Sequence, residues 1–166
     1  GKRVSYGARA ITKGGFNSLP KMSFPGGLLL GCDAGTLNSS KIKGSHTAMK
    51  SGILGAEAVF EALKEGKPGE EITSFDDRFK DSWLYKELFN ERNFSPGMHK
   101  FGNFVGGAIA FFEQNILHRT LPFTVHDTVP DYATLKTADQ SKKIEYPRPD
   151  NKLTFDRLSS VFMSNT

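Results

Sequence analysis

The residues best suited to binding chemistry stand in one stretch, residues 27–52, which reads GLLLGCDAGTLNSSKIKGSHTAMKSG. An apolar run ends at GCDAG, a polar loop follows, and a helix rich in small residues is predicted to begin near Gly44. The first backbone amides of a helix have no partner within the helix, and the helix dipole places about half a positive charge there. The stretch therefore predicts a site for an anionic or electron-rich ligand, held mainly by backbone N–H groups.

A flavin fits such a site well. Its reduced ring carries negative charge near N1 and O2, so a helix N-terminus beside those atoms stabilises the reduced form and raises the redox potential. Gly44 is expected to permit close approach of the ring. Glycine-flanked turns of this kind also occur in α/β proteins without any ligand, so the pattern alone leaves that alternative open.

Composition excludes several other kinds of site. Cys32 is the only cysteine among 166 residues, so the chain can form neither an internal disulfide nor a four-cysteine iron–sulfur site. Its four histidines have no recognisable ligand spacing, and no metal site is predicted. The net charge is +4, but basic and acidic residues are interleaved, so we expect no nucleic-acid binding, whereas an anionic membrane surface suits this charge. No stretch reaches the roughly 20 apolar residues that span a bilayer.

Two strands are predicted to lead into the site. Residues 3–12 and 27–32 have strand-like composition, and Pro and Gly lie between them. The second run is short, continuously apolar and bounded by glycines. That pattern is typical of a strand buried on both faces in a parallel sheet.

A helix is predicted over residues 45–64, where Gly66 and Pro68 stop it. Gly52 and Gly55 inside it indicate that another backbone or a ligand approaches closely, because interior glycine otherwise destabilises a helix. The apolar side chains fall on one helical face: Met49, Ile53, Ala56, Phe60 and Leu63.

A second helix is predicted over residues 74–92, capped by Ser74, with Asp77 in its first turn and NFSPG at its end. Its large side chains are expected to lie in the core: Phe75, Phe79, Trp83, Leu84, Leu88 and Phe89. From residue 121 the chain is expected to be extended, with LTFDRLSSVFM as a final strand or short helix.

A third helix is predicted over residues 98–119, and its segment FGNFVGGAIAFF is apolar around the whole circumference. It is either a buried core helix or a segment that dips into a membrane. In the second case Lys100, His118 and Arg119 would meet the lipid headgroups.

Four quoted segments, in the order KIKGSHTAMKSG, SWLYKELFNERNFSP, IEYPRPD and LTFDRLSSVFMS, closely resemble the electron transfer flavoprotein–ubiquinone oxidoreductase family. The resemblance covers essentially the whole chain. It extends to the wider flavoprotein reductases, in which GDAAG ends a strand and a G…A..SG..AAE helix follows. One departure is that Cys32 follows Gly31 where those proteins have Asp, and Asp33 comes one position later. It therefore stays open whether Asp33 or only backbone amides hold the ribityl chain.

The resemblance implies a membrane-associated enzyme with FAD and a [4Fe-4S] cluster that passes electrons from reduced electron transfer flavoprotein to ubiquinone. Its implied location is the matrix side of the mitochondrial inner membrane or the bacterial cytoplasmic membrane. The family's GxGxxG element and cluster cysteines lie outside the matched region. We therefore expect half an FAD site, inactive alone, that the remainder of the enzyme or a partner chain completes. The alternative is a non-catalytic structural subunit of a respiratory assembly derived from that enzyme.

The implied fold class is α/β, and α+β in detail. Residues 1–66 are expected to form the second half of an FAD-binding, Rossmann-like region. Residues 67–120 would form a helical region with a helix close to membrane and quinone, and residues 121–166 an extended C-terminal wrap.

The resemblance also implies site residues, none of which acts as an acid, base or nucleophile or binds a metal. Gly31 to Gly35 would approach the ribityl and pyrophosphate portion of FAD, Asn38 would lie in the flavin loop, and the helix start would lie under the ring. The FAD set is Gly31, Asp33, Gly35, Asn38, Gly44, Ser45, His46 and Thr47. The set close to membrane and quinone is Phe101, Phe104, Gly106, Gly107, Phe111 and Phe112.

Overall fold

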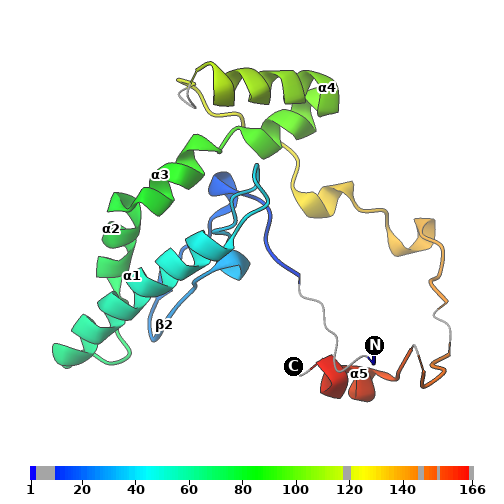
Figure 1. The fold of residues 1–166 in the computed structure, drawn as a ribbon, viewed down its shortest axis with the longest axis horizontal. Helices are drawn as coiled ribbons and strands as arrows, with labels where there is room; N and C mark the ends of the chain where they lie inside the picture. Colours follow the sequence, from blue (N-terminus) through cyan, green and yellow to red (C-terminus); the bar gives the residue numbers. More distant parts are fainter. Residues whose placement is uncertain (3–9, 118–120, 146–147, 153, 165–166) are drawn as a thin grey trace. The chain divides into compact units, whose positions relative to one another are not determined.

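The computed structural model describes residues 1–2, 10–117, 121–145, 148–152 and 154–164. The chain divides into two compact units, Ile11–Thr128 and a unit formed by Gly1–Ala10 with Val129–Thr166. The larger unit is helical with one small sheet (Figure 1), which is an α+β composition. Its elements are η1 (Phe16–Ser18), β1 (Ser23–Phe24), β2 (Gly27–Leu28), η2 (Cys32–Ala34), α1 (Ser45–Lys64), α2 (Thr73–Asp81), α3 (Trp83–Asn90) and α4 (Phe94–Asn115).

The sheet is an antiparallel hairpin, and no parallel pairing of strands is present among the described residues. Ser23 pairs with Leu28, and Phe24 pairs with Gly27. Gly26 lies at φ 80° and turns the chain back at once, and strands joined by so short a turn can pair only antiparallel. Strand β2 ends at Leu28, and the apolar residues 29–30 after it are exposed. The other predicted strand falls mainly on residues 3–9, outside the described residues, and residues 10–12 are not in a strand.

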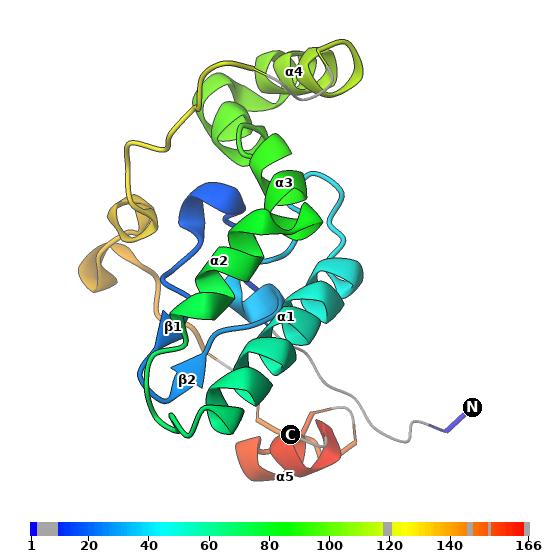
Figure 2. The ribbon, with the colours of Figure 1, turned by 90° about the vertical axis from the view of Figure 1, so that its left-hand side faces the viewer.

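Helix α1 confirms the predicted bounds, and Gly66 follows its end at φ 70°. The helix packs against α2 and α3 (Figure 2). It does so with the face opposite to the apolar stripe, which is exposed at Met49, Ile53, Ala56, Phe60 and Leu63. The buried face carries mostly small side chains because neighbours come close: a Cβ at Gly55 would lie 2.8 Å from Cδ1 of Leu30. A neighbour does approach Gly55, but it is the side chain of Leu30 and not the predicted backbone or ligand, and Gly52 has no neighbour there.

The single helix predicted over residues 74–92 is in fact two helices, α2 and α3, because Ser82 breaks it. Ser82 is extended (φ −78°, ψ 157°); its Oγ donates to the carbonyl of Phe79 at 2.6 Å and accepts the amide of Tyr85 at 3.3 Å. That second bond caps α3. Helix α2 begins one residue before Ser74, without a side-chain cap, and its first-turn acid is Asp76 instead of Asp77.

The core of the larger unit contains Phe75, Phe79, Leu84 and Leu88, as predicted. Trp83 and Phe89 are exposed, contrary to the expectation that they lie in the core. Phe89 touches only the edge of the core, through the rings of Phe16 and Tyr85. The motif NFSPG does not end a helix. Its Asn is the N-cap of α4, and its Pro stands in the first turn, where a missing N–H breaks no helical hydrogen bond.

Helix α4 is bent at Gly102, whose φ of 73° and ψ of 173° are not helical. Beyond the bend the chain returns along its own first turns: a Cβ at Gly106 would lie 2.7 Å from the carbonyl oxygen of Gly97 and 2.9 Å from Cα of Met98. The predicted core helix is wrong for this chain, because in the apolar segment 101–112 only Gly106 and Ala110 are buried. Residues 118–119, expected at lipid headgroups, lie outside the described residues. Nowhere in the described residues does a helix have the length and hydropathy needed to cross a bilayer.

The smaller unit contains η3 (Asp131–Thr134), η4 (Ala138–Gln140) and α5 (Arg157–Ser164). Residues 121–130 and most of the segments between these elements carry no regular structure, as expected. The C-terminal segment is a short helix, one of its two predicted forms. Asp156 caps it, since Oδ1 accepts the amide of Ser159 at 2.9 Å.

Candidate functional site

The turn at GCDAG is built around two glycines in left-handed backbone. Gly31 has a φ of 80° and Gly35 a φ of 101°, conformations that L side chains rarely adopt. Between them Cys32–Ala34 forms the single 3₁₀ turn η2. The amide of Gly31 donates to Oγ of Ser51 at 3.0 Å, and this bond fixes the turn against the second turn of α1.

The loop after the turn is polar and yet buried. Thr36 and Asn38 have no exposed surface, and Leu37 and Ser39 have almost none. The backbones of Asn38 and Lys43 form an antiparallel bridge with bonds of 3.0 and 3.3 Å, which closes the loop. We call residues 31–47, which include the turn, this loop and the first residues of α1, the flavin loop after the ligand that the sequence predicts for it.

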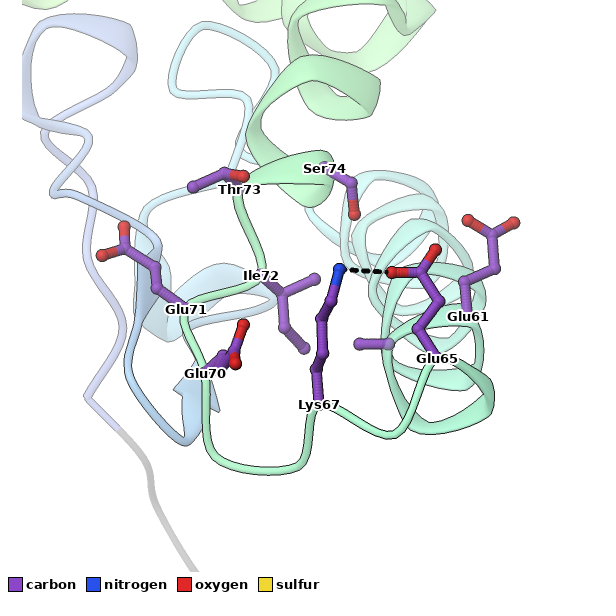
Figure 3. Close-up of a pocket in the computed structure, with 9 residues that line it drawn as sticks. Glu61, Glu65, Lys67, Glu70, Glu71, Ile72, Thr73 and Ser74 are labelled. Atoms are coloured by element: carbon purple, nitrogen blue, oxygen red, sulfur yellow. Dashed lines mark hydrogen bonds and ion pairs between the residues drawn. The ribbon is translucent and has the colours of Figure 1, made fainter.

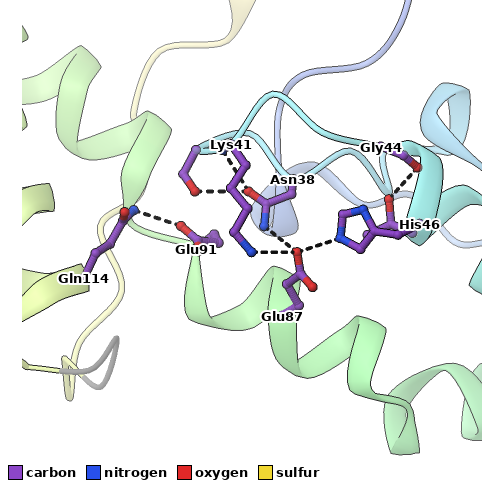
Figure 4. Close-up of polar contacts among 9 residues, drawn as sticks. Asn38, Lys41, Gly44, His46, Glu87, Glu91 and Gln114 are labelled. Atoms are coloured by element: carbon purple, nitrogen blue, oxygen red, sulfur yellow. Dashed lines mark hydrogen bonds and ion pairs between the residues drawn. The ribbon is translucent and has the colours of Figure 1, made fainter.

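Three side chains of the flavin loop converge on one carboxylate oxygen from α3 (Figure 4). Oε1 of Glu87 accepts Nδ2 of Asn38 at 2.7 Å and Nζ of Lys41 at 3.3 Å, and it lies 2.9 Å from Nε2 of His46. The His46 ring also stacks on Trp83, with centroids 5.9 Å apart and planes 6° apart. The sequence did not point to Glu87, because it lies on a separate helix, far along the chain from its partners in the loop.

The environment of Glu87 favours its charged form. Partial burial alone would raise the pKa of this carboxyl, but hydrogen bonds from His46, Asn38 and Lys41 outweigh it and lower the pKa below its ordinary value of 4.5. At neutral pH the loop is therefore tied to α3 by charge-assisted hydrogen bonds.

Gly44 was expected to let a flavin ring come close, but the space beside its Cα is already occupied. The position that a Cβ of Gly44 would occupy is filled by Sγ of Cys32 and lies 2.9 Å from Cδ1 of Leu37. Thr47 is buried, and its hydroxyl donates to the carbonyl of Gly44 at 2.9 Å. Ser45 is exposed.

Two features of the flavin loop suit a polar or anionic ligand. The N-cap of α1 is Gly44, which has no side chain to cap the helix. The first backbone amides of α1 therefore have no side-chain acceptor at the N-cap. Thr36 Oγ1 is buried without a hydrogen-bond partner, and such an orphaned group is destabilising unless something absent pairs with it. Outside these two features, Asp33 is exposed, and its carboxylate can accept hydrogen bonds from hydroxyl groups. These groups fit the chemistry of a flavin half-site.

A metal centre has no support in the described part of the chain, where no group of three or more His, Cys, Asp or Glu could hold an ion. The lone thiol of Cys32 is held in its neutral form, because partial burial and then the charge of Asp33 raise its pKa.

A hollow between the end of α1 and the start of α2 is a separate feature (Figure 3). Four carboxylates, from Glu61, Glu65, Glu70 and Glu71, line it together with Lys67, whose Nζ lies 2.9 Å from Oε2 of Glu65. An excess of acidic groups would repel the phosphates of FAD. We therefore place no FAD contact there.

The second candidate region is the outer part of α4 with the two residues after it, which we call the apolar arm (residues 101–117). Phe104 is 95% exposed. Seven other apolar side chains of the arm are also exposed: Phe101, Val105, Ile109, Phe111, Phe112, Ile116 and Leu117. Of the predicted glycines, Gly106 is buried at the return of the chain, and Gly107 has no atom near its Cβ position.

A buried polar junction attaches the arm to the rest of the larger unit. Nδ2 of Asn93 donates to Oε1 of Glu113 at 3.0 Å and to the carbonyl of Phe123 at 3.1 Å. Arg92 donates from its guanidinium to the carbonyl of Leu121 at 2.6 Å and stacks on the ring of Phe89 at 3.9 Å. The position of the arm is thus set by polar groups at its base.

Comparison with known proteins supports the resemblance found in the sequence. The chain is 64% identical over 167 residues to the electron transfer flavoprotein–ubiquinone oxidoreductase of Pseudomonas aeruginosa. It is 58% identical to a probable enzyme of that name in Acinetobacter baylyi, and 47% identical to the mitochondrial protein of Homo sapiens. No protein-family model matches the chain.

Each of these matches covers the whole chain, but the chain spans only about 30% of the length of the relatives, with values of 30%, 32% and 28%. The predicted kinship is thereby confirmed, and over its entire length this chain is homologous to a segment of the electron transfer flavoprotein–ubiquinone oxidoreductases.

Proposed function

We propose that this chain is part of an electron-transferring flavoprotein dehydrogenase that passes electrons from reduced electron transfer flavoprotein to ubiquinone. The observation that carries the proposal is the 64% identity along the whole chain to a protein of that name. The buried flavin loop and the helix start without a side-chain cap also support the proposal, because they suit a flavin half-site.

In this proposal residues 31–47 form one half of an FAD site. FAD supplies the redox chemistry when bound, and the chain binds and orients it. The amides of Ser45, His46 and Thr47 would donate to the electron-rich part of the ring, while the Asp33 carboxylate and the Thr36 hydroxyl would accept hydrogen bonds from the ribityl hydroxyls. Gly31 and Gly35 hold the turn that brings these groups together.

The rest of the enzyme completes the site. We propose that residues 1–66 belong to a Rossmann-like FAD-binding region, whose ADP half comes from outside this chain. A [4Fe-4S] cluster also lies outside, since one cysteine cannot ligate it. The assembled enzyme would work at the mitochondrial inner membrane or the bacterial cytoplasmic membrane.

The apolar arm is proposed to enter one leaflet of that membrane. Each phenyl group moved from water into lipid contributes roughly 1.5–3 kcal/mol, so the four phenylalanines of the arm suffice for stable attachment. Ubiquinone is itself a lipid-soluble molecule, and an arm in the leaflet gives it a route to the flavin.

The FAD proposal is tested in a hybrid protein, in which this chain replaces the matching segment of the Pseudomonas aeruginosa relative. We expect the hybrid to bind FAD and to reduce a ubiquinone analogue with reduced electron transfer flavoprotein, whereas the chain alone binds no flavin. A hybrid that folds but contains no FAD would contradict the proposal and favour a structural subunit.

A matched pair of variants locates the ligand. Thr36→Val removes the unpaired hydroxyl and should weaken FAD binding about 5- to 10-fold, the loss of one hydrogen bond. Thr47→Val removes a hydroxyl that is already bonded within the chain, so it should lower stability more than FAD affinity. If both variants bind FAD as the parent hybrid does, Thr36 does not face the cofactor.

The membrane proposal is tested by cosedimentation with liposomes of anionic and zwitterionic phospholipid. The double variant Phe104→Ser/Phe111→Ser should stay in the supernatant with its flavin content unchanged. Phe60→Ser, a change at an exposed phenylalanine on α1, should still sediment. Release by Phe60→Ser alone would place the membrane surface on α1.

A further inference from the structure

Glu87 of α3 is the only point among the described contacts at which three side chains of the flavin loop meet one atom. We propose that Glu87 is the positioning residue of the FAD half-site and that its negative charge sets the redox potential of the flavin. This inference rests on the proposed function. It adds to the half-site a residue from α3, outside the flavin loop.

The geometry makes Glu87 a brace between the middle of the flavin loop and the start of α1. Asn38 and Lys41 come from the middle of the flavin loop, whereas His46 lies in the first turn of α1. One oxygen atom holds all three, at 2.7, 3.3 and 2.9 Å. The loop therefore cannot shift relative to the helix start without breaking at least one of these contacts.

Asn38 depends on this brace because its side chain is completely buried. Its Oδ1 accepts the amide of Lys41 at 3.1 Å and the hydroxyl of Ser40 at 3.0 Å, so the loop itself satisfies that oxygen. The amide Nδ2 has Glu87 as its partner. Without the carboxylate, a buried donor would lose its acceptor, and such a loss is destabilising.

Trp83 supports the same arrangement from the previous turn of α3. Its ring stacks parallel to His46, while Glu87 meets the edge of that imidazole. Trp83 and Glu87 are four residues apart and so lie on one face of the helix. This face of α3 thus fixes the plane as well as the position of the residue at the helix start.

The charge of Glu87 acts against the helix dipole. Its side chain is 18% exposed, so water screens it only in part. A negative charge near the start of α1 disfavours addition of electrons to a flavin there, whereas the positive charge of Lys41 favours it. The two residues should therefore shift the flavin potential in opposite directions.

The test measures the flavin midpoint potential of the hybrid by equilibrium reduction against a reference dye. Glu87→Gln keeps the shape and removes the charge, and it should raise the potential. Lys41→Met removes the opposite charge and should lower the potential. Glu87→Asp should restore the potential toward that of the parent hybrid, and Glu65→Gln, a change in an exposed pair far from the loop, should not move it.

Opposite signs are the decisive result, because mere loosening of the loop would shift both variants in the same direction. Equal potentials in the Glu87→Gln variant and the parent hybrid, or shifts of the same sign, overturn the inference. If Glu87→Gln does not fold, an unchanged potential in Lys41→Met overturns it. Failure of the parent hybrid to bind FAD overturns the proposed function and this inference together, whereas FAD binding with unshifted variants overturns this inference alone.

Discussion

The flavin loop and the apolar arm have opposite relations between polarity and burial. In the loop the polar residues Thr36 and Asn38 are completely buried, whereas in the arm Phe104 is almost completely exposed. Hydrophobic transfer alone would predict the reverse. Polar groups can be buried where neighbours satisfy them, and large exposed apolar patches mark surfaces for another partner. Asn38 follows the first rule, whereas Thr36 Oγ1 is buried without a partner and the arm is the exposed patch.

Burial in this chain thus depends on specific partners. Asn38 makes five hydrogen bonds, three through its side chain and two through its backbone bridge with Lys43, and these outweigh its desolvation. The arm is anchored at its base, where Glu113 accepts from Asn93 and Gln114 donates to Glu91. Both regions can be tested in the hybrid protein.

The largest effect should come from comparing two phenylalanines. Phe75→Ala creates a cavity in the core and should lower the free energy of unfolding by about 3–5 kcal/mol. Phe104→Ala in the arm should change it by less than about 0.5 kcal/mol. Denaturant unfolding without lipid measures both. A large loss from Phe104→Ala would show that other parts of the enzyme cover the arm, and the comparison would break down.

The next effect concerns two adjacent glycines of the arm. Gly106→Ala places a Cβ against the backbone of residues 97–98 and should destabilise the return of the chain by about 1–3 kcal/mol. Gly107→Ala meets no atom, so it should stabilise the helix by up to about 1 kcal/mol. Thermal unfolding of both variants gives the sign directly. Equal shifts would mean that the arm does not fold back at this point.

A smaller effect should appear when the loop is titrated. The pKa of Glu87 is lowered in the folded protein, so its stabilisation is fully present above the ordinary value of 4.5 and is lost as pH falls through the lowered value. Unfolding free energies of the parent hybrid and Glu87→Gln should differ by about 1.5 kcal/mol at pH 7 and converge in acid. A difference that persists unchanged in strong acid would contradict the role of this charge.

The smallest effect is expected at the acidic hollow. Lys67 and Glu65 are bonded at 2.9 Å, but both are exposed. Water and salt screen such a pair, so Lys67→Ala should leave the melting temperature unchanged within error. A clear drop in the melting temperature would show that this exposed ion pair stabilises the fold, as the buried contacts of the flavin loop do.

Local signals in the sequence predicted much of the fold. The bounds of α1 were predictable because an apolar repeat of helical period ends at Gly66, and the last helix was one of two predicted forms. The break at Ser82 was not, since serine also occurs inside helices and only its bonds to Phe79 and Tyr85 show the cap. The buried face of α1 was missed because its small residues carry little hydropathy signal.

The candidate site was predictable only where the backbone defines it. Gly31 and Gly35 were selected from the sequence, and both have the positive φ that explains glycine there. Glu87 and the orphaned hydroxyl of Thr36 were missed, because contacts between distant segments leave no local pattern. The FAD contacts themselves stay a prediction until the complete site is measured.

The packing of Cys32 against Gly44 has a consequence for how these sequences can diverge. The sulfur occupies the space that a β-carbon at position 44 would need. A larger residue at position 44 should therefore be tolerated only with a smaller residue at position 32. Across an alignment of many homologues the side chains at positions 32 and 44 should therefore covary in size, with glycine at 44 wherever position 32 carries a side chain as large as cysteine.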